Sequence, residues 1–287
     1  MRYSLAILAA IAAHVSAHGV ITEIQGANGV NMPGLSVQDG TPRDCASPGC
    51  GSEADTSIIR AKEVGGKASP LGRTQGGGAV DAGAAIATFM GTGAAGATAK
   101  RQLLAGLLGG KGKGKAGAAG GAAAGAGTKT AKGTTEQGVA AAAGSGASSG
   151  LPTTADDGTI TMTFHQVNQD GAGPLTAQID ATSGGTDATA FQDATVTQDV
   201  PGIGIGGLSA ASTMDFPVKV QMPAGMTCTG TAGGASNVCV VKMQNSALAG
   251  PFGGSAAFTQ STAAKKRAVE YNLRKRHMAR GILGKPE

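Results

Sequence analysis

Alternating apolar and polar residues predict β-structure in the second half of the chain. From position 160 the order is Ile160, Thr161, Met162, Thr163, Phe164 and His165. A strand with this pattern buries the three apolar side chains and directs His165 to the opposite face. Further short apolar runs between Gly, Pro and Asn clusters predict strands at 175–179, 194–197, 216–222, 238–243 and 255–258.

The first half contains fewer regular patterns. Residues 18–60 are rich in turn formers and predict one strand followed by ordered loops. The partly helical spacing of Val80, Ile86, Phe89 and Met90 predicts a short helix. Many short strands, long loops and few helices predict an all-β fold, an immunoglobulin-like or fibronectin-like β-sandwich with long loops.

Two segments depart from this pattern. Between 95 and 150, sixteen of the 56 residues are Gly and most others are Ala, Lys, Ser or Thr. So little apolar bulk predicts a disordered Gly/Ala/Lys insertion. The last segment predicts a basic C-terminal tail, flexible or helical. The expected organisation is a signal peptide at 1–17, sandwich parts at 18–94 and 151–261, the insertion at 95–150 and the tail at 262–287.

The amino terminus has the pattern of a secretory signal. Met1 and Arg2 precede an apolar stretch too short to span a bilayer, and small residues end it at Ala17. Cleavage there makes His18 the first residue. No later apolar run approaches about 18 residues, so we expect no transmembrane segment. The predicted location is secreted, either extracellular or associated with the cell wall.

Export also bears on the cysteines and on the charge. Four cysteines lie beyond the signal, and an oxidising route predicts two disulfides. Three connectivities are open, of which we favour the local pairs 45 with 50 and 228 with 239.

The insertion and the tail each carry a net charge of +6, whereas the rest of the mature chain carries −8. The basic character therefore belongs to two segments of an exported protein, which argues against nucleic-acid binding.

A released His18 offers a metal two nitrogens, its α-amine and a ring nitrogen. A second histidine would complete a three-nitrogen site, for which copper is the best match. His165 is the candidate, although it could also be a hydrogen-bonded turn residue. Asp44, Glu53 and Asp55 surround the first cysteine pair; they could hold calcium, or Asp44 and Asp55 could pair with Arg43 and Arg60.

Four separated motifs carry a resemblance to a known family. They are His18-Gly-Val-Ile-Thr-Glu-Ile-Gln-Gly, the run from Gly40 to Arg60 around Cys45 and Cys50, His165-Gln-Val-Asn-Gln-Asp-Gly-Ala-Gly-Pro174, and Gly250-Pro-Phe-Gly-Gly254. Together they resemble the fungal Egh-type virulence factors, also described as appressorium-specific proteins. The resemblance implies secretion by a filamentous fungus, often during development on a host surface.

The same histidines resemble the histidine brace of lytic polysaccharide monooxygenases, which are copper enzymes with an immunoglobulin-like sandwich. By that resemblance His18 and His165 would bind copper, and Phe252 or Phe258 would take the axial position. Gln260 or Gln166 would supply the outer hydrogen bond that positions an oxygen species.

The brace resemblance implies oxidation of cell-wall polysaccharide by a monomeric protein. The sequence has no Trp, so substrate binding would be polar or lie along loops, and a soluble or hemicellulosic glycan is easier to accommodate than crystalline cellulose. Two alternatives remain open. One is a non-catalytic secreted copper-binding protein, and the other is a structural wall or surface protein that adheres during host contact.

Overall fold

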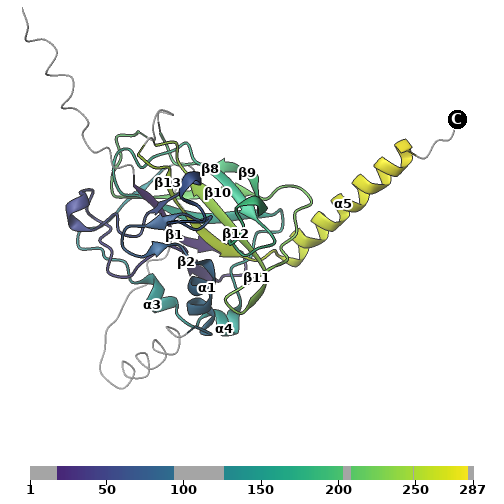
Figure 1. The fold of residues 1–287 in the computed structure, drawn as a ribbon, viewed down its shortest axis with the longest axis horizontal. Helices are drawn as coiled ribbons and strands as arrows, with labels where there is room; N and C mark the ends of the chain where they lie inside the picture. The colour runs from purple at the N-terminus through teal and green to yellow at the C-terminus, as the bar shows by residue number, and fades with distance from the viewer. Residues whose placement is uncertain (1–17, 94–125, 203–207, 248, 284–287) are drawn as a thin grey trace, which may run out of the picture.

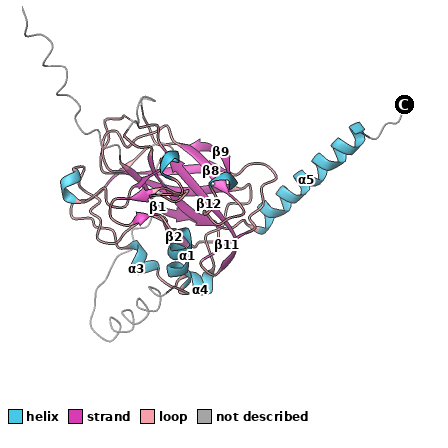
Figure 2. Ribbon diagram, in the orientation of Figure 1, coloured by secondary structure: helices cyan, strands magenta, loops and turns pink. Residues whose placement is uncertain are grey.

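Antiparallel strands, connected by long loops, form the centre of the molecule (Figures 1 and 2). The structure, a computed structural model, describes residues 18–93, 126–202, 208–247 and 249–283. The strands are β1 (Gly19–Gln25), β2 (Asn31–Pro33), β3 (Ser57–Ile58), β4 (Arg73–Thr74), β5 (Gly78–Ala79), β6 (Thr128–Lys129), β7 (Thr159–Gln166), β8 (Thr176–Asp180), β9 (Phe191–Gln198), β10 (Met214–Gln221), β11 (Gly230–Ala232), β12 (Ala235–Gln244) and β13 (Phe252–Phe258). The helices are α1 (Ala82–Met90), α3 (Gly138–Ala142), α4 (Gly146–Ser149) and α5 (Thr262–Leu283), with 3-10 turns at Pro48–Cys50, Ala61–Glu63 and Ala188–Ala190.

The strands form one continuous curled sheet, which confirms the predicted all-β sandwich class. Its order is β2-β1-β7-β10-β9-β8-β12-β13-β3-β4-β5, with β11 paired to β12 and β6 to β10. Curling brings β1 against β13, although the two strands are not neighbours in the hydrogen-bonded order. Strands from before the long insertion stand at both ends of this order, and strands from after it lie between them, because β1 pairs with β7 and β3 pairs with β13.

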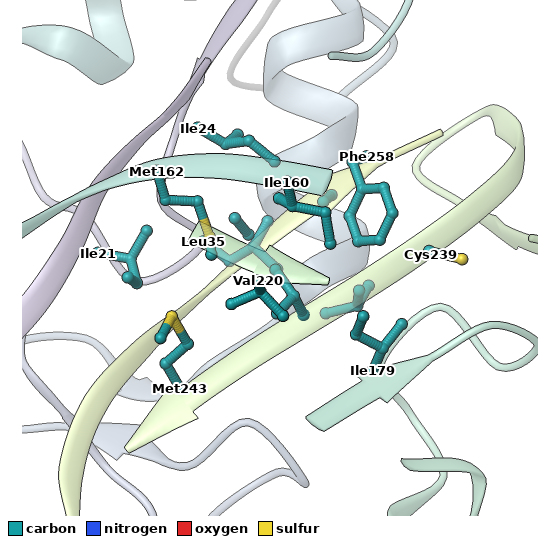
Figure 3. Packing of buried hydrophobic residues seen from close by; sticks show 14 of the residues in the cluster. Ile21, Ile24, Leu35, Ile160, Met162, Ile179, Val220, Cys239, Met243 and Phe258 are labelled. Atoms are coloured by element: carbon teal, nitrogen blue, oxygen red, sulfur yellow. The ribbon is translucent and has the colours of Figure 1, made fainter. Parts of the chain in front are cut away.

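The core lies inside the curl of the sheet. Ile160, Met162 and Phe164 of β7 are buried in it, as their alternation predicts. Figure 3 shows residues of β1, β7, β10, β12 and β13 meeting in this cluster. β1 and β13 approach so closely that a Cβ on Gly254 would lie 2.5 Å from the backbone nitrogen of Ile21. Glycine at 254 therefore permits the contact that closes the curl.

The predicted short helix is α1. The Asp81 side chain accepts a hydrogen bond from Ala84 N, which caps the first turn. Gly91 ends the helix in a left-handed conformation, with φ at 69°. Ile86 and Phe89 face the core, so α1 is held by one apolar side.

The end of the insertion differs from the prediction of disorder. Residues 126–150 contain β6, α3 and α4, and β6 adds to the edge of β10 at Asp215. The segment is held by backbone pairing and by an ion pair between Glu136 and Arg43. Its small residues allow close packing, since a Cβ on Gly146 would lie 2.6 Å from the ring of Phe89. Hydrogen bonds and close approach replace the apolar bulk on which the prediction relied. Residues 94–125 lie outside the described residues.

Both predicted disulfides are confirmed. Cys45 is bonded to Cys50 and Cys228 to Cys239. The first closes the loop before the turn at Pro48–Cys50, and the second anchors the segment before β11 to β12. Each bridge fixes a local loop, and neither connects the two halves of the chain.

The tail is helical. α5 packs on the body through Ala264 and Ala268 and through a hydrogen bond from Asn272 to Gly225 O. Beyond these contacts it projects away from the sheet (Figure 1), and Leu273 and Met278 are exposed. None of the described helices is long and apolar enough to cross a membrane.

Replacement of Arg43 by Ala tests the buried ionic network that holds residues 126–137. Arg43 bonds to both oxygens of the fully buried Asp55, at 3.0 and 2.6 Å, and to Glu136 at 2.8 Å. Arg43→Ala leaves the Asp55 carboxylate buried without its counter-charge, so we expect the free energy of unfolding to fall by roughly 3–5 kcal/mol.

Urea unfolding measures this change. The matched control, Arg274→Ala, removes an exposed arginine on α5 and should alter stability by less than about 0.5 kcal/mol. Equal effects of the two substitutions would contradict a structural role for the Arg43 network.

Candidate metal centre

His18 lies at the beginning of β1, next to the end of β7. Its carbonyl accepts a hydrogen bond from Val167 N at 3.0 Å, which extends the ladder in which Val20 pairs with His165. Because side chains alternate along a strand, this register directs His18 and His165 toward the same face. The two predicted histidine ligands, 147 positions apart in the sequence, are therefore neighbours across two paired strands.

The backbone nitrogen of His18 is held by a buried amide. It donates to Asn168 Oδ1 at 2.7 Å, and Asn168 Nδ2 donates to Glu53 Oε1 at 3.0 Å. The same Glu53 oxygen lies 3.2 Å from Nδ1 of His18. Asn168 and Glu53 thus fix both the backbone nitrogen and the ring of His18.

Two acidic side chains, Glu53 and Asp170, lie in the region of His18. Burial, together with the nearby charge of Asp170, raises the pKa of Glu53 to about 7. Burial also raises the pKa of Asp170. Burial disfavours the negative charge of both carboxyl groups, and for Glu53 the charge of Asp170 adds to this effect. A positive charge placed between them would stabilise their ionised forms.

His165 is fully buried on β7 and has one oriented ring nitrogen. Its Nδ1 lies 2.7 Å from Oδ1 of Asp215, which β10 places directly opposite in register. The other ring nitrogen, Nε2, is buried and has no hydrogen-bond partner among the described residues. With the proton on Nδ1, Nε2 would present a lone pair, as in the carboxylate–histidine–metal arrangement of many metal sites.

Of the two phenylalanines proposed for the axial position, Phe252 is near His18 and Phe258 is not. The rings of Phe252 and His18 have centroids 4.4 Å apart, at an angle of 40°. Phe258 lies six residues further along β13, roughly 20 Å away at the usual rise of a strand. It belongs to the main core, opposite Cys239. The structure therefore places only Phe252 at the candidate centre.

The two candidate glutamines also occupy different places. Gln166 is buried and directly follows His165 in sequence, and its amide nitrogen lies within hydrogen-bond distance of Asn168 O, Ser209 Oγ and Ala211 O. Gln260 follows the far end of β13, where its side chain bonds to the backbone of Met226 and Cys228. Gln166 is connected to the candidate ligand His18 through Asn168. Gln260 instead lies just before the start of α5.

Three residues of this site escaped the sequence analysis as participants. Asn168 is within the motif that begins at His165, and Glu53 is within the motif around the first disulfide, so their positions in these two motifs were the available signal. Asp215 had no signal, because its contact with His165 depends on the register of β10 against β7.

The arrangement brings two imidazoles and the main-chain nitrogen of His18 into one region of the fold. No group of three or more His, Cys, Asp or Glu side chains that could hold a metal occurs in the part of the chain that the structure describes. A brace uses two side chains and an amine, so it does not require such a group.

Removal of the Asn168 side chain tests whether this amide holds the site together. Asn168→Ala deprives His18 N and a Glu53 oxygen of buried partners, and we expect it to lower the free energy of unfolding by roughly 2–4 kcal/mol. Urea denaturation provides the measurement. Asn31→Ala is the matched control, since Asn31 is exposed and bonds to Glu23. Comparable losses in the two variants would show that Asn168 has no special role.

Comparison with known proteins agrees with this arrangement of motifs. Residues 16–253 match the family of Egh16-like virulence factors. The appressoria-specific virulence factor GAS2 of Pyricularia oryzae is 60% identical over 285 residues, covering 98% of this chain and 97% of GAS2. The appressoria-specific virulence factor GAS1 of the same fungus is 38% identical over 129 residues, covering 44% of this chain and 50% of GAS1. No solved structure matches the chain. The chain belongs to the Egh16-like virulence factor family.

Proposed function

We propose that this chain is a secreted virulence factor of the fungal appressorium that binds one copper ion through His18 and His165. The role in the appressorium is supported by the 60% identity to GAS2 along nearly the whole of both chains. Secretion is supported by the signal-like amino terminus and by two disulfides among the described residues.

One observation carries the copper proposal. His165 is buried, its Nδ1 is paired with Asp215, and its Nε2 has no partner in the described structure. A buried ring nitrogen without a partner is costly, and a metal ion removes this cost by accepting the lone pair. The carboxylate of Asp215 fixes the tautomer that makes Nε2 the ligand atom.

His18 provides the other ligands in this proposal. Signal cleavage after Ala17 converts its backbone nitrogen into an α-amine, and Asn168 Oδ1 can still accept a hydrogen bond from that amine. Diagonal neighbours across an antiparallel pair are roughly 7–8 Å apart, within reach of two imidazoles that share one ion. Imidazole and amine nitrogens are the ligands that divalent copper prefers.

The residues around the ion would set its access and charge. Phe252 covers one side of the His18 ring and keeps water from it, while Glu53 and Asp170 favour a cation. Bound copper would supply one-electron chemistry with oxygen or peroxide. Asp215 also lines a polar cleft of about 550 Å³ with many Thr side chains, which suits a hydroxyl-rich glycan better than a crystalline surface.

Burial favours a second candidate, a non-catalytic copper-binding protein. The His18 residue is 3% exposed and the His165 residue is 0% exposed. A polymer cannot reach buried ligands without movement of the surrounding loops, whereas a single ion needs only a narrow path. Polysaccharide oxidation and copper sequestration would therefore use the same ligands. They differ in whether a polymer must reach the bound ion.

Copper titration tests the proposed ligands. On secreted protein whose first residue is confirmed as His18, His18→Ala or His165→Ala should abolish tight binding of one equivalent and the nitrogen-rich electron paramagnetic resonance signal. Asp215→Asn should weaken binding by roughly 10–100-fold, because it removes only the partner that orients His165. Calorimetry measures the affinities.

His277→Ala is the matched control, since His277 is exposed on α5. It should bind copper as the unmodified chain does. If His165→Ala and His277→Ala behave alike, the brace is excluded. Given tight binding, oxidised products from soluble glycans with a reductant would support catalysis, and their absence would support sequestration.

A further inference from the structure

We propose that a second site, a half-open cavity between α1, α3 and the segment after β2, binds a neutral aliphatic molecule that carries a hydroxyl group. The cavity has a volume of about 290 Å³. Figure 1 shows β2, α1 and α3 gathered at one end of the sheet, and α3 contacts β2. None of the candidate metal ligands lines this cavity, so the proposal does not depend on copper.

The walls of the cavity are mainly apolar. Leu35, Val80 and Phe89 belong to the main core and also line the cavity, and Val139 of α3 lines it too. Pockets of this size with apolar walls and a few polar groups are typical of small-molecule sites. The cavity is therefore continuous with the core and lies in the space that the side chains of α1 and α3 leave unfilled.

One polar group in the wall lacks a partner. Ser36 is 6% exposed, and its buried hydroxyl has no hydrogen-bond partner in the described structure. The hydroxyls of Thr74 and Thr88, which also line the cavity, are bonded to Gln38 and to Ala84 O. Ser36 is therefore the group that a ligand hydroxyl would satisfy once the serine side chain turns toward the cavity.

The charge of the wall selects a neutral ligand. Among the described residues that line the cavity, Asp81 is the one with a charged side chain, and it caps α1. The lining offers no Lys or Arg to a carboxylate or phosphate. A fatty alcohol fits this wall, whereas a fatty acid anion would meet a negative charge.

The volume sets the length of the ligand. A cavity of about 150 Å³ holds benzene, so one of about twice that volume holds roughly ten to twelve carbons. Each methylene that enters should strengthen binding about fourfold until the cavity is full. The dependence of affinity on chain length is therefore the signature of this site.

The experiment uses the full secreted chain and the fluorescent probe N-phenyl-1-naphthylamine, displaced by 1-alkanols of six to sixteen carbons. We expect affinity to rise about fourfold per methylene and to level off at roughly ten to twelve carbons. Dodecanol should displace the probe at a lower concentration than dodecanoate at neutral pH. A length dependence without a plateau, or preference for the carboxylate, would overturn the proposal.

Two variants locate the ligand. Ser36→Val should weaken dodecanol about fivefold, through the lost hydrogen bond, and leave the affinity of the probe unchanged. Ala84→Phe places a ring at the mouth of the cavity from an exposed position of α1 and should abolish displacement by alkanols. The matched control is Ala140→Phe, which adds the same ring to an exposed position of α3 that does not line the cavity.

Equal urea midpoints would show that each variant is folded. If Ala84→Phe and Ala140→Phe bind dodecanol alike, the alkanol occupies another surface, such as the exposed apolar side chains of α5, and the cavity site is excluded. An unchanged dodecanol affinity in Ser36→Val would exclude the assigned hydrogen bond.

Discussion

The pairing of β1 with β7 is the constraint on which both the fold and the candidate centre depend. It joins the segment before the long insertion to the segment after it, and places Val20 directly opposite His165. A shift of one residue would turn every side chain of β1 to the other face. Ile21 and Ile24 would leave the core and His18 would leave the side of His165. The burial of these isoleucines therefore also fixes the geometry of the histidines.

A second layer of contacts holds the outer side of this strand pair. β6 extends the sheet at β10, and the Glu136–Arg43–Asp55 network connects that segment to the loop after β2. The same loop continues to Glu53, which contacts His18 and Asn168. Because Glu53 lies between Arg43 and Asp55 in the chain, the ionic network and the candidate centre share one loop.

The sequence predicted those parts of the structure that depend on local pattern. Alternation identified the buried face of β7, and short spacing favoured the two local disulfides. The predicted cleavage position singled out His18 from its place in the chain alone. Each of these inferences uses residues close together in sequence, where few arrangements compete.

Long-range contacts could not be predicted in this way. Asn168 and Glu53 are 115 residues apart, and Asp215 meets His165 only because β10 pairs with β7 in one register. The order of residues 126–150 escaped prediction for a related reason. Composition measures the apolar bulk of a segment, whereas this segment is held by backbone pairing and by one ion pair to a distant arginine.

The two side chains of the His165–Asp215 pair differ in their exposure to solvent. The side chain of Asp215 is 40% exposed and lines a polar cleft, whereas the side chain of His165 is 1% exposed. Solvent therefore reaches the carboxylate that orients the ring, but not the ring itself. A molecule in the cleft would therefore contact Asp215 and not His165. On the side of His18, the loop that carries Glu53 is held by the buried Arg43–Asp55 pair. The pair that stabilises the fold therefore also holds the loop whose Glu53 contacts His18.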